Sequence, residues 1–158
     1  MSRFLRIYLN DQLALGIGWR ELARRAANEN RGTDTGEALG RVATAIAEDV
    51  ATFERIMERL GVPRNRVKTG LAIAGERVGR LKLNGRLRGY SPLSRFVELD
   101  VLVMGIEGKK ILWENLADLA GLRERLPDVD FDELVARAER QRTELEPHRR
   151  AAGTALRA

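Results

Sequence analysis

Apolar residues recur at every third or fourth position in four long segments of the chain, as they do on the buried face of an α-helix. The first segment runs from about residue 3 to residue 30, with apolar positions at Phe4, Leu5, Tyr8, Leu15, Trp19, Leu22 and Ala26. The second carries the most regular stripe, which consists of Leu39, Val42, Ala43, Ile46, Val50, Phe53, Met57 and Leu60. A stripe of this length predicts the seam of a helical bundle.

Start and stop signals bracket the second and third segments. Asp34 followed by Glu37 forms a capping-box pattern, so we expect the second helix to begin with Asp34 as its cap. Gly61 and then Pro63 predict the end of that helix. Ser91-Pro92 places a cap residue before a proline at the first helical position, which predicts the start of a third long helix.

The third helix is expected to end near Gly121, and the fourth to begin at the cap Asp130, with Glu133 three residues on. The third is apolar nearly all round over residues 96–106, so we expect it to be the most buried helix. Pro147 lacks a backbone donor and should kink or restart the fourth helix. The apolar face of the fourth helix comprises Phe131, Leu134, Val135, Ala138 and Leu145.

The connection between the second and third helices, residues 62–91, is long enough to cross a whole bundle. Its apolar residues at helical spacing predict a short amphipathic helix: Val67, Leu71, Ala74, Val78 and Leu81. Asn84-Gly85 predicts a small hairpin or extended loop over residues 81–90, with continued helix as the alternative. The expected fold is therefore all-α: one domain over residues 1–158, an antiparallel four-helix bundle with a long basic crossover between helices 2 and 3.

Composition agrees with such a bundle. Of the 158 residues, 44% are hydrophobic and 32% charged, as in ordinary globular proteins, while only 5% are aromatic, so aliphatic side chains must fill the core. The absence of cysteine excludes disulfides, thiolate metal sites and a cysteine nucleophile. The sequence shows neither a signal-peptide core nor a membrane-spanning stretch, so we expect a cytoplasmic protein.

The net charge of +5 is concentrated in one segment. Residues 62–95 contain nine basic residues and one acidic residue, whereas the rest of the chain has a net charge of −3. A basic cluster of this kind can contact acidic lipid or nucleic-acid phosphates, or it can simply cover its own bundle. No nucleic-acid-reading motif accompanies it. The candidate anion-binding residues are Lys68, Arg77, Arg80, Lys82, Arg86 and Arg88.

Three stretches of the predicted helices carry a family resemblance: Glu48-Asp49-Val-Ala-Thr52, Met104-Gly-Ile-Glu107 and Ala138-Glu139-Arg-Gln-Arg142. Together with the helix layout, they resemble the ferritin-like superfamily, rubrerythrin-type bundles especially. In that family the second and fourth helices each supply a Glu-x-x-His pair of iron ligands, and the third supplies a Glu. The resemblance implies a bundle whose relatives often hold two iron ions in the core.

The chain departs from this family at the iron ligands. Thr52 and Arg142 stand where histidines are expected, and the single histidine, His148, lies elsewhere. Gly16 to Gly18 occupies the stretch of the first helix where a ligand Glu is expected. A di-iron site uses about four carboxylates and two imidazoles, so we expect no metal and no other cofactor. A carboxylate-only site for iron or manganese is the alternative, and it would consist of Asp49, Glu107 and Glu139.

Glu107 has two interpretations. It shares a heptad-spaced row with two other acidic residues, which favours an acidic stripe in contact with water. Alternatively, it is a buried carboxylate paired with Arg142, since a buried carboxylate must be paired or neutralised. We expect Trp19 and Trp113 in the core and His148 at the surface.

These observations favour a non-catalytic ferritin-like bundle that acts as an interaction or oligomer-forming protein. One alternative is a carboxylate-bound metal protein of the di-iron type with redox or oxygen chemistry. Another is a protein that binds an anionic surface, acidic lipid or nucleic acid, through residues 64–90. The missing histidine pair favours the non-catalytic bundle over the metal protein, and no catalytic residue is identified.

Overall fold

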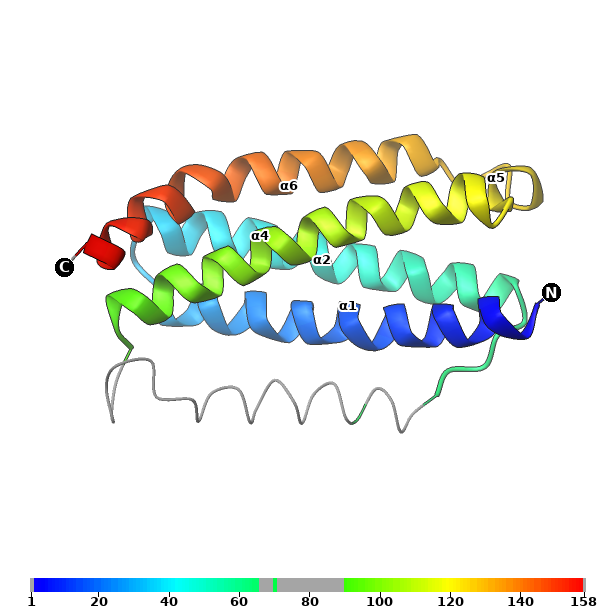
Figure 1. Ribbon diagram of the computed structural model, residues 1–158, viewed down its shortest axis with the longest axis horizontal. Helices are drawn as coiled ribbons and strands as arrows, with labels where there is room; N and C mark the ends of the chain where they lie inside the picture. Colours follow the sequence, from blue (N-terminus) through cyan, green and yellow to red (C-terminus); the bar gives the residue numbers. More distant parts are fainter. Residues whose placement is uncertain (1, 66–69, 71–89, 158) are drawn as a thin grey trace.

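The computed structural model describes residues 2–65, 70 and 90–157. Four long helices run along the molecule: α1 (Arg3–Glu29), α2 (Asp34–Arg59), α4 (Pro92–Glu114) and α6 (Phe131–Ala152) (Figure 1). Shorter turns complete the chain: the π-helix η1 (Asn115–Leu119), α5 (Leu122–Arg125) and the 3-10 helix η2 (Gly153–Arg157). The predicted all-α fold with four main helices is confirmed.

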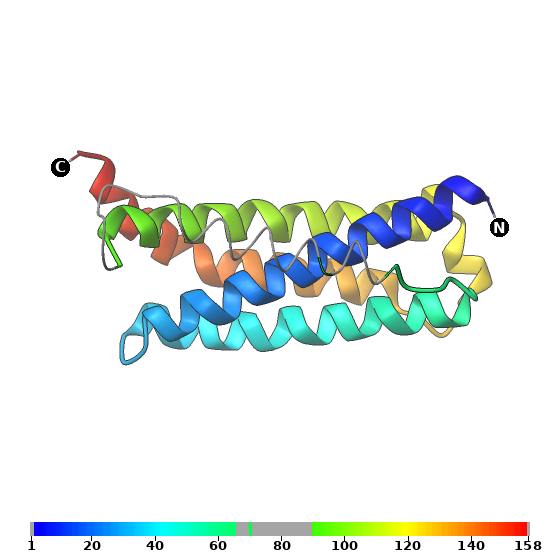
Figure 2. The same cartoon turned by 90° about the horizontal axis from the view of Figure 1, so that it is seen from below.

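Each long helix is antiparallel to the helices beside it. α1 pairs with α2 and α4 pairs with α6, and the two hairpins meet through α1 against α4 and α2 against α6 (Figure 1; Figure 2). On the diagonal, α2 and α4 run in the same direction, so α2 ends at the opposite end of the bundle from the start of α4 (Figure 1). The chain between them must therefore span the bundle, as a long crossover does. The hairpin or extended loop predicted over residues 81–90 lies, apart from Tyr90, outside the described residues.

The helix starts are capped by side chains. Ser91 and Asp130 cap α4 and α6 as predicted. The cap of α2 is Thr33, whose hydroxyl accepts a hydrogen bond from the Gly36 amide at 3.1 Å. Asp34, predicted as this cap, is instead the first helical residue. A carboxylate there still faces the positive end of the helix dipole.

Two predicted helix ends give different outcomes. Gly61 adopts a φ of 66° directly after the C-cap of α2, as the sequence predicts. In contrast, α6 continues through Pro147 to Ala152 as one helix, so the predicted restart is not found.

The buried face of α1 differs from the predicted one in its first half. Phe4 and Leu15 are 82% and 53% exposed, whereas Leu9, Leu13 and Ile17 are buried. The helix crosses the bundle obliquely, so its two halves bury different faces (Figure 2). A single stripe drawn along the whole helix therefore describes only its second half correctly.

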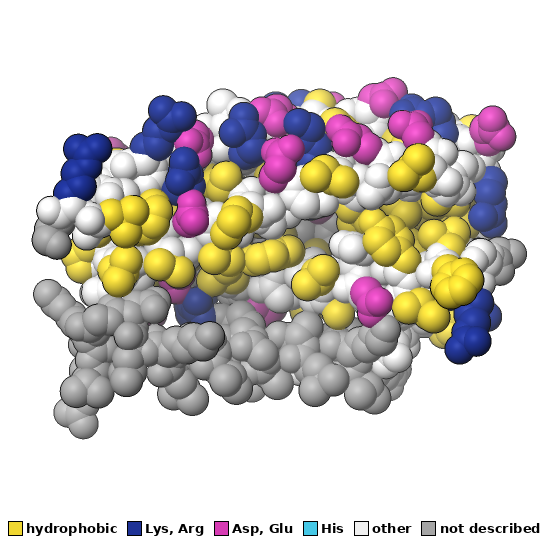
Figure 3. All heavy atoms as spheres, viewed as in Figure 1, with side chains coloured by type: hydrophobic (Ala, Val, Ile, Leu, Met, Phe, Trp, Pro, Cys, Tyr) yellow, Lys and Arg dark blue, Asp and Glu magenta, His cyan; other side chains and the backbone are white. Residues whose placement is uncertain are grey.

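The prediction that the third long helix is the most buried is wrong. Six residues of α4 are buried, against ten of α2, and Met104 and Ile111 of α4 are exposed. Apolar side chains consequently gather on the surface over α1 and α4 (Figure 3). Within the described ranges, no helix has the length and apolar character needed to cross a membrane.

The core has two apolar halves. One half surrounds Phe53 and Trp113, whose ring centroids lie 5.8 Å apart. The other half surrounds Leu39, Leu102 and Leu145. Polar side chains lie between these halves, at the middle of the bundle.

Candidate functional site

A layer of polar side chains, Asp49, Lys109, Arg137 and Gln141, separates the two halves of the core. Asp49 of α2 is 2% exposed and Gln141 of α6 is 5% exposed. Lys109 of α4 places its Nζ 2.5 Å from Asp49 Oδ2 and also donates to Gln141 Oε1. Gln141 Nε2 donates to the same Asp49 oxygen at 2.9 Å. These contacts join three helices in one hydrogen-bonded triangle.

Arg137 of α6 supplies a second cation to Asp49. Its Nη2 lies 2.9 Å from Asp49 Oδ1 and 3.1 Å from Glu48 Oε2. The contact with Oδ1 is an ion pair without hydrogen-bond geometry. Glu48 is largely exposed and Arg137 is partly exposed, so the layer holds one buried carboxylate, Asp49, in contact with two cations.

Burial governs the electrostatics of Lys109. Loss of water around the ammonium lowers the pKa of Lys109 below its ordinary value of 10.5. The charge and hydrogen bond of Asp49 oppose this shift, and the charge of Arg137 adds to it. A buried pair offsets its desolvation only when its geometry is close, and the 2.5 Å contact meets this condition.

Helical spacing explains why these polar residues are buried. Lys109 stands three residues after Ile106 and four before Trp113, and both of these side chains are buried. Asp49 and Gln141 occupy equivalent places in the apolar stripes of α2 and α6. Lys109 and Gln141 are not among the site residues predicted from the sequence, although this spacing is a signal that identifies them.

Glu107 and Glu139 belong to a different group, at the surface. Lys110 Nζ lies 3.7 Å from Glu107 Oε1 and 3.2 Å from Glu139 Oε2. Arg142 contacts both carboxylates as well, with Nη2 2.7 Å from Glu139 Oε1 and Nε 3.8 Å from Glu107 Oε2. The hydrogen bonds from Arg142 and Lys110 hold the pKa of Glu139 at about 2. Glu107 is 45% exposed, so it lies in contact with water and also near Arg142.

The described residues do not fit the di-iron site that the family resemblance implies. Asp49 lies in the buried layer, whereas Glu107 and Glu139 lie in the surface group. Lysine and arginine side chains occupy the positions around all three carboxylates where a metal ion would bind. Within residues 2–65, 70 and 90–157, no three His, Asp or Glu side chains gather as metal ligands.

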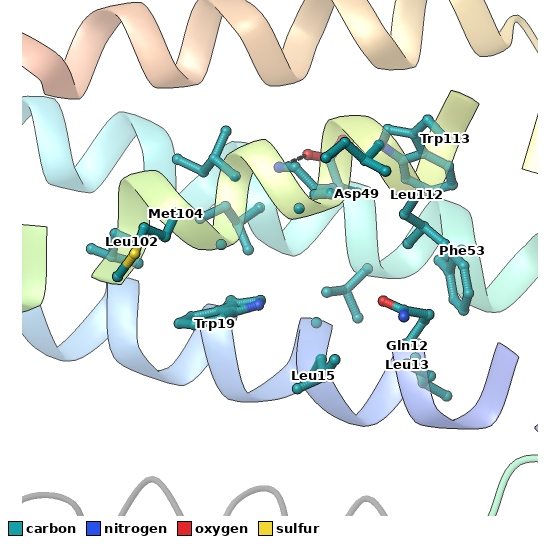
Figure 4. Close-up of a pocket in the computed structure, with 18 of the residues that line it drawn as sticks. Gln12, Leu13, Leu15, Trp19, Asp49, Phe53, Leu102, Met104, Leu112 and Trp113 are labelled. Carbon is teal, nitrogen blue, oxygen red and sulfur yellow. Dashed lines mark hydrogen bonds and ion pairs between the residues drawn. The ribbon is translucent and has the colours of Figure 1, made fainter. Parts of the chain in front are cut away.

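An apolar cavity of about 330 Å³ lies beside the polar layer, between α1 and α4. Figure 4 shows Leu15 and Trp19 on the α1 side and Met104 on the α4 side. Asp49 and Lys109 form part of the wall that faces the bundle interior. The cavity is therefore apolar around most of its wall and polar where it meets the layer.

Two glycines of α4 shape this cavity. A Cβ atom on Gly105 would lie 2.7 Å from the ring of Trp19, so only glycine allows the indole to approach the α4 backbone this closely. One turn later, a Cβ on Gly108 would meet no atom within 4 Å, because Gly108 faces open space.

Tyr90 takes part in a second polar group, at the start of α4. Its hydroxyl accepts from Asn30 Nδ2 at 2.8 Å and donates to Glu98 Oε2 at 2.9 Å. Arg25 Nη2 lies 2.7 Å from Glu98 Oε1. Burial, the first cause, and the neighbouring Glu98 raise the pKa of Tyr90 above its ordinary value. These contacts fix Tyr90 to the bundle.

The remaining predicted residues have mixed outcomes. Trp113 is buried as predicted, while Trp19 is partly buried and lines the cavity. His148 is partly exposed, and its Nδ1 lies 3.0 Å from the Thr35 hydroxyl. The six candidate anion-binding residues lie outside the described part of the chain, so their role stays a prediction: Lys68, Arg77, Arg80, Lys82, Arg86 and Arg88.

Comparison of the chain with protein-family models, curated proteins and solved structures gives no match in any of the three.

Proposed function

We propose that this protein is a non-catalytic bundle of ferritin-like architecture that acts by binding, with a second copy of itself as its partner. The ferritin-like part is supported by the two antiparallel hairpins and by the parallel direction of α2 and α4, which requires one long crossover. The observation that carries the non-catalytic part is the neutralisation of Asp49 by Lys109 and Arg137.

Asp49 is the carboxylate on the bundle axis that the resemblance associates with iron. Both of its oxygens face cationic side chains, so neither is available to bind a metal ion or to accept a proton from a substrate. The amide of Gln141 occupies the remaining lone-pair direction of Oδ2. Asp49 therefore serves to hold three helices together.

Iron loading tests the non-catalytic proposal. Protein purified without a histidine tag is incubated with ferrous iron in air, desalted and analysed for metal. We expect far less than one iron per chain and no absorbance from an oxo-bridged centre. Two tightly held iron ions per chain would overturn the proposal.

The proposed binding surface is an apolar strip on α1 and α4, made of Phe4, Ile7, Leu15, Met104 and Ile111. All five side chains are exposed, and apolar groups gather over these two helices (Figure 3). The three residues of α1 lie within roughly 80° of one another around the helix, at 100° per residue. Exposed apolar surface of this kind marks interaction sites, and a two-fold axis would bring the strip of one copy against that of another.

Sedimentation velocity over a range of protein concentrations tests self-association. We expect the wild type to associate and the variant Phe4→Glu/Ile7→Glu to remain monomeric, because four buried charges would face one another across the two-fold axis. Leu119→Glu/Leu156→Glu is the matched control, since it adds the same charge at exposed apolar positions outside the strip. A monomeric wild type would refute self-association, and equal effects of the two variants would refute the strip as its site.

A further inference from the structure

We propose that the cavity between α1 and α4 binds an amphipathic carboxylate with an unbranched hydrocarbon body of about ten carbon atoms, a size set by the cavity volume. The inference goes beyond the proposed self-association. Leu15, Met104 and Ile111 belong both to the strip and to the cavity lining, but all residues that line the cavity belong to one chain, so ligand binding needs no second copy. Three observations carry it: the size of the cavity, the unpartnered N–H group of Lys109 and the charge of the adjoining polar layer.

The size and lining of the cavity fit a short hydrocarbon chain. Its 330 Å³ is close to the volume that about eleven water molecules occupy in the liquid, and so to a ligand of about that many non-hydrogen atoms. Ligand pockets begin at about this volume and are lined mainly by apolar side chains. The apolar lining residues include Leu15, Trp19, Met104, Ile111 and Leu112.

One donor in the wall lacks an acceptor. Lys109 carries three N–H groups, of which Asp49 and Gln141 accept two, and no other described residue accepts the third. The Lys109 side chain is 14% exposed and lines the cavity, so an oxygen of a bound carboxylate would supply the acceptor that this donor lacks.

The charge of the polar layer next to the wall favours an anionic head group over a neutral one. The wall itself holds one negative charge, Asp49, and one positive charge, Lys109. Behind the wall, Arg137 places a second cation on Asp49, and only the exposed Glu48 balances that cation. Gln12 adds a polar amide from the α1 side of the cavity (Figure 4). A carboxylate head at the polar layer would therefore leave its hydrocarbon tail between α1 and α4.

Isothermal titration with decanoate and with decanol, both below their micelle concentrations, tests the ligand class. We expect decanoate to bind at least tenfold more tightly than decanol. Equal affinities would overturn the anionic head group, and no binding of decanoate would overturn the proposal. Lys109→Met should remove the difference between the two ligands. If Lys109→Met fails to fold, Gln12→Leu replaces it as the test. This substitution leaves the polar layer intact and should weaken decanoate binding.

A pair of glycine variants tests the location. Gly108→Leu places a side chain in the open space of the cavity and should reduce decanoate affinity at least tenfold. Gly40→Leu is the control, because a Cβ there also meets no atom within 4 Å but Gly40 lies in α2, outside the cavity. Equal effects of the two variants would place the binding elsewhere and overturn the proposal.

The variant Phe4→Glu/Ile7→Glu separates this proposal from self-association, because neither residue lines the cavity. We expect this variant to bind decanoate with wild-type affinity even when it no longer associates. Loss of decanoate binding together with association would show that the ligand lies between two copies, which would overturn a site within one chain.

Discussion

Lys109 and Asp49 face each other across the diagonal of the bundle, with Nζ 2.5 Å from Oδ2, although the two residues are 60 positions apart. Their helices, α4 and α2, are not neighbours around the bundle. The pair therefore links the two hairpins at the bundle axis, and Gln141 extends the link to a third helix.

Removing one member of this pair should destabilise the protein strongly. Asp49→Leu leaves the Lys109 ammonium buried with only Gln141, which should lower the free energy of unfolding by about 3–5 kcal/mol. The double variant Asp49→Leu/Lys109→Met removes both charges, and we expect it to regain most of this loss. Urea unfolding followed by circular dichroism measures both, and strictly additive effects of the two substitutions would contradict the pairing.

The stability of the single variant Asp49→Leu should also depend on pH. Burial already lowers the pKa of Lys109, and loss of Asp49 removes the charge that opposes this shift. A lysine with a lowered folded-state pKa binds fewer protons when folded than when unfolded, so stability rises as pH rises toward the unfolded value of 10.5. We therefore expect the defect of Asp49→Leu to be smaller at pH 9.5 than at pH 7.

Two glycines one turn apart in α4 should respond oppositely to alanine. Gly105→Ala forces a Cβ to within 2.7 Å of the Trp19 ring and should lower the melting temperature by separating α1 from α4. In Gly108→Ala the added Cβ has no atom within 4 Å, so this substitution should stabilise the helix by about 0.5–1 kcal/mol. Melting temperatures that shift in the same direction would contradict the close contact at Gly105.

The apolar seam of α2 predicts a contrast between two neighbouring residues. Phe53→Ala should lower the free energy of unfolding by about 3–5 kcal/mol, because Phe53 is buried against Trp113. Arg55→Ala should have little effect, since Arg55 is exposed and its contact is with Thr52 one turn earlier on the same helix. Equal melting temperatures of the two variants would show that α2 buries a different face.

Acid should destabilise the protein through Glu139 and Glu146. Hydrogen bonds from arginine, together with Lys110 in the case of Glu139, hold the pKa of each carboxyl at about 2, below its ordinary 4.5. Carboxyls with depressed pKa values stabilise the folded state above pH 4.5, and this stabilisation is lost as the pH falls from about 4.5 to about 2. Between pH 4.5 and pH 2, we expect the melting temperature of Glu139→Gln/Glu146→Gln to fall less than that of the wild type. Because both carboxylates are in contact with solvent, the difference should shrink in 1 M salt.

The basic segment makes a prediction that only a binding measurement can test. If it binds anionic surfaces, reversing Lys82, Arg86 and Arg88 to Glu should abolish retention on heparin or on acidic vesicles without a large change in melting temperature. Retention should also fall between low and moderate salt, because exposed charges are screened within about 10 Å at 0.1 M.

A charge-matched variant separates a binding site from bulk charge. Arg3→Glu/Arg6→Glu/Arg125→Glu carries the same net charge and alters three exposed arginines outside the segment. Equal loss of retention in this variant and in the Lys82, Arg86 and Arg88 variant would mean that net charge alone is responsible.

The helices and most of their ends are readable in the sequence because local signals specify them. Ser91 and Asp130 act as the caps that their neighbours predict, and Gly61 ends its helix. The exposed face of α1 is not readable in this way. Phe4 and Leu15 have the spacing of buried residues, and only the crossing of α1 over the bundle decides which apolar face is covered.

The polar layer is not readable in the sequence for a related reason. Charged residues usually lie at the surface, and the one buried pair considered from the sequence, Glu107 with Arg142, is partly exposed. Lys109 lies on the apolar stripe of α4, yet its burial depends on Asp49 and Gln141, on two other helices. Periodicity shows which face of a helix is buried, but pairing across helices decides which charges can be buried there.

The parallel direction of α2 and α4 also has a kinetic consequence. Contacts within each hairpin, α1 with α2 and α4 with α6, close short loops, whereas contacts between the hairpins close a loop of about the length of the crossover. Loop-closure entropy therefore favours formation of the two hairpins before they dock. The Lys109–Asp49 pair forms only when the hairpins meet in the correct register, so mutations of this pair should mainly change the unfolding rate, while those within a hairpin should also slow folding.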